Sequence, residues 1–186
     1  MSNSPLRRMI AASVPDFWRL WYVGLIVATV RWLETIAVGV VVYQRTDSAF
    51  LVSMMTMLRL LPMGLFGVFF GALAERFDRG RTLLIVVLLM GGTSAVLAVL
   101  DRTGQLEIWH LAFASFINGC GWCTDNPVRR VMIGEVVGRE KMSLAMSLDV
   151  GANNASRMVG PVIGGILLAG AGLEGVLILS TLMYCA

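Results

Sequence analysis

The chain has 186 residues, of which 57% are hydrophobic and only 15% charged, and its formal net charge is +3. Soluble domains carry about 25% charged and 45–50% apolar residues, so this composition excludes a globular protein that covers its own water-facing surface. The basic residues gather in short segments between long apolar runs, which argues against nucleic-acid binding and makes the lipid bilayer the expected main partner.

The apolar runs are continuous rather than alternating, and this pattern predicts membrane-spanning helices of about 20 residues each. A polar tail over residues 1–16 precedes an expected transmembrane bundle over 17–186. Its helices are expected at about 17–43, 50–74, 82–100, 108–124, 144–171 and 175–186. The segment 125–143 is expected between two helices, with room for a short surface helix. The last run is too short to cross a bilayer, so we expect the sixth helix to be truncated.

Basic residues also predict the orientation of the bundle. If the N-terminal tail is cytoplasmic, most Lys and Arg outside the spans fall in cytoplasmic segments, whereas the outer loops hold Arg45 and Arg102. This bias agrees with the positive-inside rule. Six spans are also consistent with two inverted three-helix repeats, a common way to build transporters.

A cluster of small and charged residues follows the second expected helix. It consists of Gly71, Glu75, Arg76, Asp78, Arg79, Gly80 and Arg81. The two acids and three arginines can form charge-assisted pairs at the cytoplasmic boundary. Such pairs would latch two helices in one conformation and release them in another. The alternative is that the arginines serve only as topology signals.

Charged and amide side chains inside the spans are candidates for a proton-coupling site or a substrate cavity, because each is costly in lipid. The candidates are Glu34, Arg31, Arg59, Asn118, Asn154 and Arg157. Arg31 and Glu34 are three residues apart and therefore share a helix face. We expect Glu34 to be a protonatable coupling or substrate-binding carboxylate. The alternative is a static pair with Arg31 that only neutralises its charge.

The sequence offers no set of residues for catalysis. His110 has no clear serine partner, the Asp residues form no matching site, and no phosphate-binding G-x-x-x-x-G-K-[ST] loop is present. Cys120 and Cys123 lie in an apolar run, where small packed thiols are expected. We therefore expect a protein that is not an enzyme and that uses no metal and no cofactor.

The fifth expected helix contains a proline flanked by glycines. Pro161 removes a backbone donor and bends the helix, while Gly160, Gly164 and Gly165 permit tight packing against a neighbouring helix.

The cluster over residues 71–81 resembles the signature loop of the major facilitator superfamily, usually G-x-L-A-D-R-x-G-R-R. The matching residues are Gly71, Leu73, Ala74, Arg76, Gly80 and Arg81. Glu75 stands where aspartate is usual, and one inserted residue gives R-F-D-R-G-R. This form, with Tyr43 and the segment Leu58–Pro62, resembles the bacterial branch of enterobactin-exporter-like and macrolide-efflux-like proteins.

The glycine–proline segment resembles the antiporter motif G-P-x-x-G-G of exporters in the same superfamily. The match is partial, because Ser156 stands where an upstream glycine is expected. This resemblance leaves two interpretations open, a direct role in antiport and an ordinary kinked packing helix.

The resemblance implies a six-helix N-terminal bundle of the major facilitator fold, an all-α integral membrane protein. It implies secondary-active efflux of a small molecule, siderophore or drug-like, by alternating access and with protons as the coupling ion. A C-terminal six-helix half would then be a required partner. The implied location is the bacterial cytoplasmic (inner) membrane, with several spans and a cytoplasmic N-terminus. The alternative is a non-transporting membrane scaffold or an inactive transporter fragment.

Overall fold

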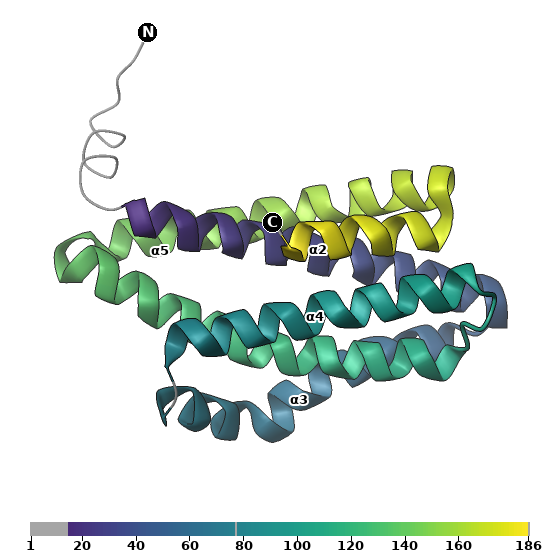
Figure 1. The fold of residues 1–186 in the computed structure, drawn as a ribbon, viewed down its shortest axis with the longest axis horizontal. Helices are drawn as coiled ribbons and strands as arrows, with labels where there is room; N and C mark the ends of the chain where they lie inside the picture. Colours follow the sequence, from purple (N-terminus) through teal and green to yellow (C-terminus); the bar gives the residue numbers. More distant parts are fainter. Residues whose placement is uncertain (1–14, 77, 186) are drawn as a thin grey trace, which may run out of the picture.

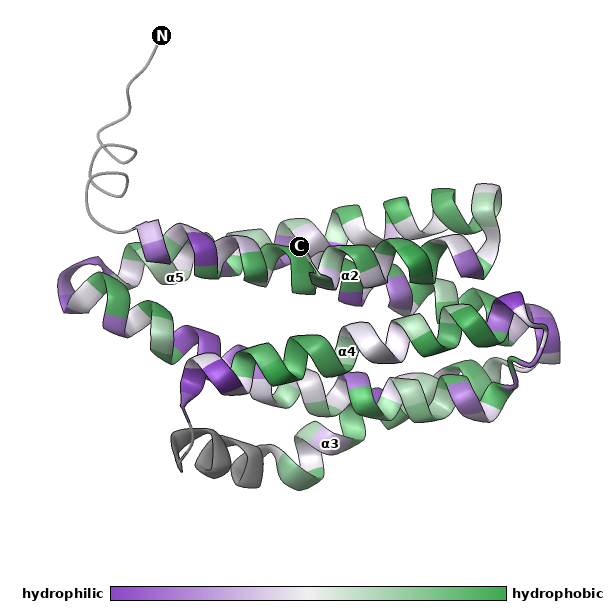
Figure 2. Ribbon diagram, in the orientation of Figure 1, coloured by the Kyte–Doolittle hydropathy of each residue, from purple (hydrophilic) through white to green (hydrophobic). Residues whose placement is uncertain are grey.

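A computed structural model describes residues 15–76 and 78–185, apart from the side chains of residues 68–76. This part of the chain forms the helices α2 (Pro15–Thr46), α3 (Ala49–Arg76), α4 (Arg79–Arg102) and α5 (Ile108–Cys185) (Figure 1). All four are long and apolar enough to cross a membrane. Hydrophobic residues cover most of their length, and hydrophilic residues gather mainly near the turns (Figure 2). The expected all-helical membrane fold is confirmed for the described residues.

Helix α5 is divided into three arms by two glycines with non-helical backbone. Gly138 has φ 72° and Gly172 has φ 67°, a region that glycine adopts without steric cost. The chain reverses direction at both positions (Figure 1). We call residues 108–137 the first arm, 139–171 the second arm and 173–185 the third arm.

The prediction for the segment 125–143 was wrong. The helix of the first arm continues through Asp125 and Arg129 and ends only at the turn around Gly138. Charged residues marked this segment as a surface connection in the sequence. Asp125 and Arg129 are both buried and lie four residues apart, so each opposes the charge of the other within the helix.

The described helices enclose four clusters of buried apolar residues along the bundle. Leu33, Val42, Leu111 and Leu177 belong to the larger core, which α2 forms with α3, α4 and α5. A smaller core lies near the Gly138 turn and contains Phe17, Ile133 and Ala145. Along α2, Arg31 and Glu34 come after Phe17 of the smaller core and before the larger-core residues 37–42. Charged side chains are thus enclosed within the bundle.

Two glycines of the antiporter-like segment bring the second arm close to α2. A Cβ atom at Gly164 would lie 2.8 Å from the carbonyl oxygen of Leu33, and one at Gly160 would lie 2.7 Å from Cβ of Trp32. At Gly165 an added Cβ would meet nothing within 4 Å. Pro161 lies inside the same helical arm. Gly160 and Gly164 therefore serve close helix packing in this structure, and Gly165 does not.

We expect Gly164→Ala to destabilise the protein by about 1–3 kcal/mol, because the added methyl group forces the second arm away from α2. Thermal unfolding in detergent micelles measures this change. Gly165→Ala is the matched control, and its stability should stay the same or rise by about 0.5–1 kcal/mol, since alanine favours the helix. Equal destabilisation by both substitutions would contradict the close packing.

Candidate functional site

Six charged residues are buried within the described bundle. They are Arg31 and Glu34 on α2, Arg59 on α3, and Asp125, Arg129 and Asp149 on α5. The set holds three cations and three anions, so its formal charges cancel. Burying an isolated charge is strongly unfavourable, and pairing reduces that cost. We therefore describe these residues by the ion pairs and hydrogen bonds that each of them forms.

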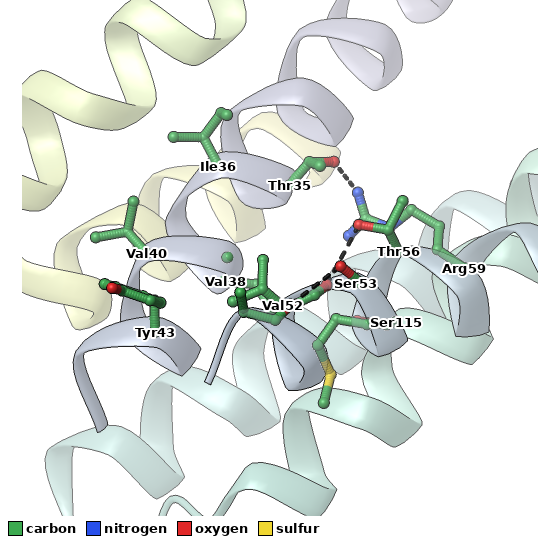
Figure 3. A pocket seen from close by; sticks show the side chains of 13 residues that line it. Thr35, Ile36, Val38, Val40, Tyr43, Val52, Ser53, Thr56, Arg59 and Ser115 are labelled. Atoms are coloured by element: carbon green, nitrogen blue, oxygen red, sulfur yellow. Dashed lines mark hydrogen bonds between the residues drawn. The ribbon is translucent and has the colours of Figure 1, made fainter. Parts of the chain in front are cut away.

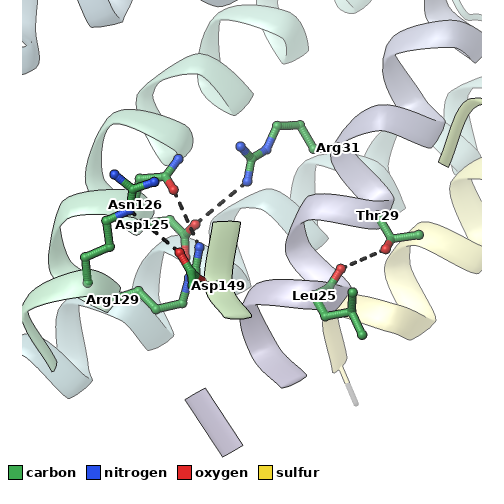
Figure 4. A network of polar contacts seen from close by, with 8 residues as sticks. Leu25, Thr29, Arg31, Asp125, Asn126, Arg129 and Asp149 are labelled. Carbon is green, nitrogen blue, oxygen red and sulfur yellow. Dashed lines mark hydrogen bonds and ion pairs between the residues drawn. The ribbon is translucent and has the colours of Figure 1, made fainter. Parts of the chain in front are cut away.

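Four of these residues form a buried network across three helical segments, shown in Figure 4. Arg129 forms an ion pair with Asp149 of the second arm, and its Nε lies 3.7 Å from Asp125 Oδ1. Arg31 Nη2 of α2 lies 3.8 Å from Asp125 Oδ2. We call Arg31, Asp125, Arg129 and Asp149 the Asp125 network. It joins α2 to the first and second arms.

A glycine on α2 makes room for this network. A Cβ atom at Gly24 would overlap the guanidinium of Arg129. On the other side, Arg130 reaches Asp149 from a half-exposed position, with Nε 3.7 Å from Oδ2. The network therefore extends from the buried Arg31 to a half-exposed side chain at the surface of the bundle.

Sequence reasoning missed Asp125, Arg129 and Asp149 as site residues. The first two were assigned to a surface connection, and Asp149 was not singled out within its span. The spacing of Asp125 and Arg129 is a signal that could have marked these two residues. It places opposite charges one helical turn apart in a helix flanked by apolar residues.

Glu34 and Arg31 share a face of α2 but have different partners. Glu34 Oε1 accepts a hydrogen bond of 2.6 Å from Ser94 Oγ on α4. Arg31 turns to Asp125, and its guanidinium carbon lies 4.9 Å from the centre of the Trp122 ring. The alternative of a static Arg31–Glu34 pair is therefore not the arrangement seen. Arg59 of α3 supplies a positive charge near the Glu34 carboxylate.

Arg59 fastens α3 to α2 and borders a pocket, shown in Figure 3. Its Nη1 donates hydrogen bonds to the carbonyl oxygen of Arg31, at 3.2 Å, and to Thr35 Oγ1. The pocket has a volume of about 550 Å³ and lies mainly between α2 and α3. Arg59 is the charged residue in its lining, beside hydroxyl groups of Thr35, Ser53, Thr56 and Ser115. Apolar side chains of both helices form the rest of the wall.

The remaining in-span candidates do not join these groups. Asn118 is buried in the first arm, where its Nδ2 donates to the carbonyl oxygen of Ala114 at 3.1 Å. Asn154 and Arg157 of the second arm are exposed. The Arg157 guanidinium carbon lies 4.9 Å from the centre of the Trp32 ring on α2. Arg31, Glu34 and Arg59 are thus the predicted residues that the fold brings together.

The signature-loop residues that the structure describes organise the start of α4. Asp78 caps the helix, and its Oδ1 accepts a hydrogen bond of 2.8 Å from the backbone N–H of Arg81. Arg79 forms an ion pair with Glu135 of the first arm. Gly80 and Arg81 are exposed. The side chains of Glu75 and Arg76 lie outside the described part of the chain, and Gly71 lies in the same stretch of α3.

Comparison with known protein families matches residues 3–186 to the transmembrane secretion effectors, a family of the major facilitator superfamily. The chain belongs to this family. The superfamily resemblance of the signature loop is thereby confirmed. The chain is a membrane protein of a transporter family, and this membership does not point to an enzyme.

Curated relatives of this family member include efflux and transport proteins. Macrolide efflux protein A of Streptococcus pyogenes is 24% identical over 124 residues, which cover 67% of this chain and 31% of that protein. The staphyloferrin A transporter of Staphylococcus aureus is 25% identical over 140 residues, which cover 75% of this chain and 35% of that protein. The matched stretches thus span about a third of each relative's length.

We expect Asp149→Asn to destabilise the protein by about 3 kcal/mol, because it leaves the buried Arg129 without a charged partner on the second arm. Thermal unfolding in detergent measures the loss. Asp16→Asn is the control, since Asp16 pairs with Arg19 at the surface and such pairs contribute less than about 1 kcal/mol. A similar loss in both variants would argue against a stabilising Asp125 network.

Proposed function

We propose that this protein moves a small molecule out of the cell by alternating access, in exchange for protons that bind to Glu34. The observation that carries the proposal is the position of Glu34. Its carboxylate is buried, accepts a hydrogen bond from Ser94, and is attracted by Arg59, which borders the pocket between α2 and α3. An ionisable side chain within a membrane span is a functional candidate by default.

The chemistry of coupling follows from the three helices that meet at Glu34. A carboxylate in a low-dielectric interior takes up a proton when its counter-charge withdraws and releases it when the counter-charge returns. Arg59 stands on α3, whereas Glu34 stands on α2 and Ser94 on α4. A shift of α3 against α2 during transport therefore changes the proton occupancy of Glu34.

The pocket beside Arg59 is the proposed contribution of this bundle to the substrate site. Its apolar wall suits a largely apolar molecule, and the guanidinium with the surrounding hydroxyl groups offers several hydrogen-bond donors. Relatives named for macrolide efflux and for staphyloferrin A transport support a drug-like or siderophore substrate. In this family, a second bundle would complete the cavity.

The proposed membrane arrangement uses α2, α3, α4 and the three arms of α5 as the N-terminal bundle, built from two inverted repeats. The N-terminus and the Gly138 turn then face the cytoplasm of a bacterial cell. The concentration of arginine residues near that end supports this orientation. The Arg79–Glu135 pair lies at the same end and connects the start of α4 to the first arm.

We expect Glu34→Gln to abolish proton-driven efflux while leaving expression intact, because glutamine keeps the size of the side chain and its bond with Ser94 but binds no proton. The protein produced from its complete reading frame is reconstituted in liposomes with an imposed pH gradient. Labelled erythromycin and staphyloferrin A are the two transport probes.

Glu107→Gln is the matched control, since Glu107 is exposed and does not line the pocket. Undiminished proton-driven flux in Glu34→Gln would overturn the assignment of Glu34. Absence of flux of either probe in the unmodified protein, together with correct membrane insertion, would favour a non-transporting scaffold.

We expect Arg59→Lys to raise the KM for the transported probe by about tenfold, because lysine keeps the charge but loses the planar group that bonds α2 and faces the pocket. Concentration-dependent flux in the same liposomes measures KM. Arg157→Lys should keep the KM of the unmodified protein, since Arg157 lies outside the pocket. An unchanged KM in Arg59→Lys would remove the pocket from the substrate site.

A further inference from the structure

Arg157 is a positive charge near the middle of the second arm. It stands roughly 28 Å along the helix from the Gly138 turn and roughly 22 Å from the Gly172 turn, at about 1.5 Å per residue. Both distances exceed the reach of an arginine side chain, so the guanidinium cannot extend to either end of the arm. Because the hydrocarbon layer of a bilayer is about 30 Å thick, Arg157 lies at a depth where lipid does not tolerate an isolated charge.

No described residue neutralises this charge. Arg157 is exposed, and it forms no ion pair with the residues that the structure describes. The three buried acids of the bundle are matched in number by the three buried arginines. The guanidinium of Arg157 lies instead over the ring of Trp32 on α2. An aromatic face attracts a cation but carries no net charge that could cancel it.

Contacts with α2 fix the position of the second arm beside Arg157. The preceding residue, Ser156, is buried, and its Oγ lies 3.1 Å from Thr29 Oγ1 of α2. Gly160 and Gly164 follow on the same helix face and pack closely against α2. Arg157 is one residue away from this face, so it stands at the edge of the contact with α2 and is left exposed.

An exposed row of residues next to Arg157 has the spacing of a helix-packing seam. Met158 is 75% exposed and Val162 is 60% exposed, although both are large and apolar. Steps of four and three residues alternate along the row, which is the repeat of two helices packed side by side. We call the whole row the second-arm seam, and its members are Gly151, Ala155, Met158, Val162, Gly165 and Ala169, all exposed.

The small residues of the second-arm seam would let a neighbouring helix approach closely. An added Cβ at Gly151 or at Gly165 would meet nothing within 4 Å, so this side of the arm is open in the described bundle. Two members of the seam are alanine, and alanine at Gly165 therefore also suits it. The second arm runs along one margin of the bundle, where a further helix can reach it (Figure 1).

The charge of Arg157 distinguishes a protein partner from lipid. Lipid would cover the apolar side chains of the seam but would leave the guanidinium unpaired in hydrocarbon. A helix with a carboxylate at the same depth would cover the seam and neutralise Arg157. The matched stretches cover only 31% and 35% of two curated relatives, so those proteins are long enough to hold a second bundle.

We propose that the second-arm seam docks a helix of a second bundle, and that this helix carries an aspartate or glutamate that pairs with Arg157 within the membrane. The face of the guanidinium lies over Trp32, which leaves its N–H groups for the two oxygens of the carboxylate. The proposal rests on the second bundle of the proposed function. It does not depend on proton binding by Glu34.

The test uses the protein from its complete reading frame, reconstituted in liposomes for flux and unfolded thermally in detergent. We expect Arg157→Gln to lower the unfolding temperature and to reduce the flux of erythromycin and staphyloferrin A alike by at least about tenfold, because the partner carboxylate stays buried without a counter-charge. Arg157→Lys should keep both, since it keeps the charge. Arg139→Gln is the matched control, because Arg139 is exposed beside the Gly138 turn of the same arm.

The partner residue is identified among the Asp and Glu residues within apolar runs outside residues 1–186. Each is changed to its amide, alone and together with Arg157→Gln. We expect one of these changes to lower the unfolding temperature when made alone and to restore it, together with the flux, in the combined variant.

The absence of any restoring combination would overturn the pair, as would a complete reading frame without such an acid. A loss of flux confined to one of the two probes, at an unchanged unfolding temperature, would assign Arg157 to substrate binding and overturn the proposal. If the unmodified protein moves neither probe, the proposed function fails, and the unfolding temperatures still decide whether the pair exists.

Discussion

Compensation of charge inside an apolar bundle is the constraint on which the rest of this structure depends. Arg31, Arg59 and Arg129 are buried with Glu34, Asp125 and Asp149, and no member of this set is tolerable there alone. The opposing partners stand mostly on different helices. Satisfying the charges therefore also fixes α2 against α3 and against the first and second arms of α5.

Close helix approach is what allows these charges to meet. In lipid, helices associate through van der Waals packing rather than through the exclusion of water, so small residues at the contacts are essential. Gly24 admits the guanidinium of Arg129, and Gly160 and Gly164 admit the backbone of α2. Gly119 of the first arm admits the backbone of α3 at Arg59. Glycine packing and ion pairing are thus two parts of one arrangement.

The buried groups divide into regions with separate proposed tasks. Arg59 and its neighbouring hydroxyl groups border the pocket, Glu34 lies behind them against Ser94, and the Asp125 network extends towards the Gly138 turn. Arg59 belongs to the first two regions, because it borders the pocket and attracts Glu34. Under the proposed function, a movement of α3 at the pocket would alter proton binding at Glu34.

The sequence by itself determined the membrane class, the helical character, the superfamily and three of the buried charges, Arg31, Glu34 and Arg59. Hydropathy and motif spacing are local properties, and a charge within a long apolar run is visible without a fold. Only the tertiary structure decided the partners, because the spacing of Arg31 and Glu34 defines a shared helix face but not what lies opposite it. It joined Arg31 to Asp125 and Glu34 to Ser94. Asp125 and Arg129 looked like surface residues for the same reason, since a charge becomes acceptable inside a bundle only through neighbours that distant segments supply.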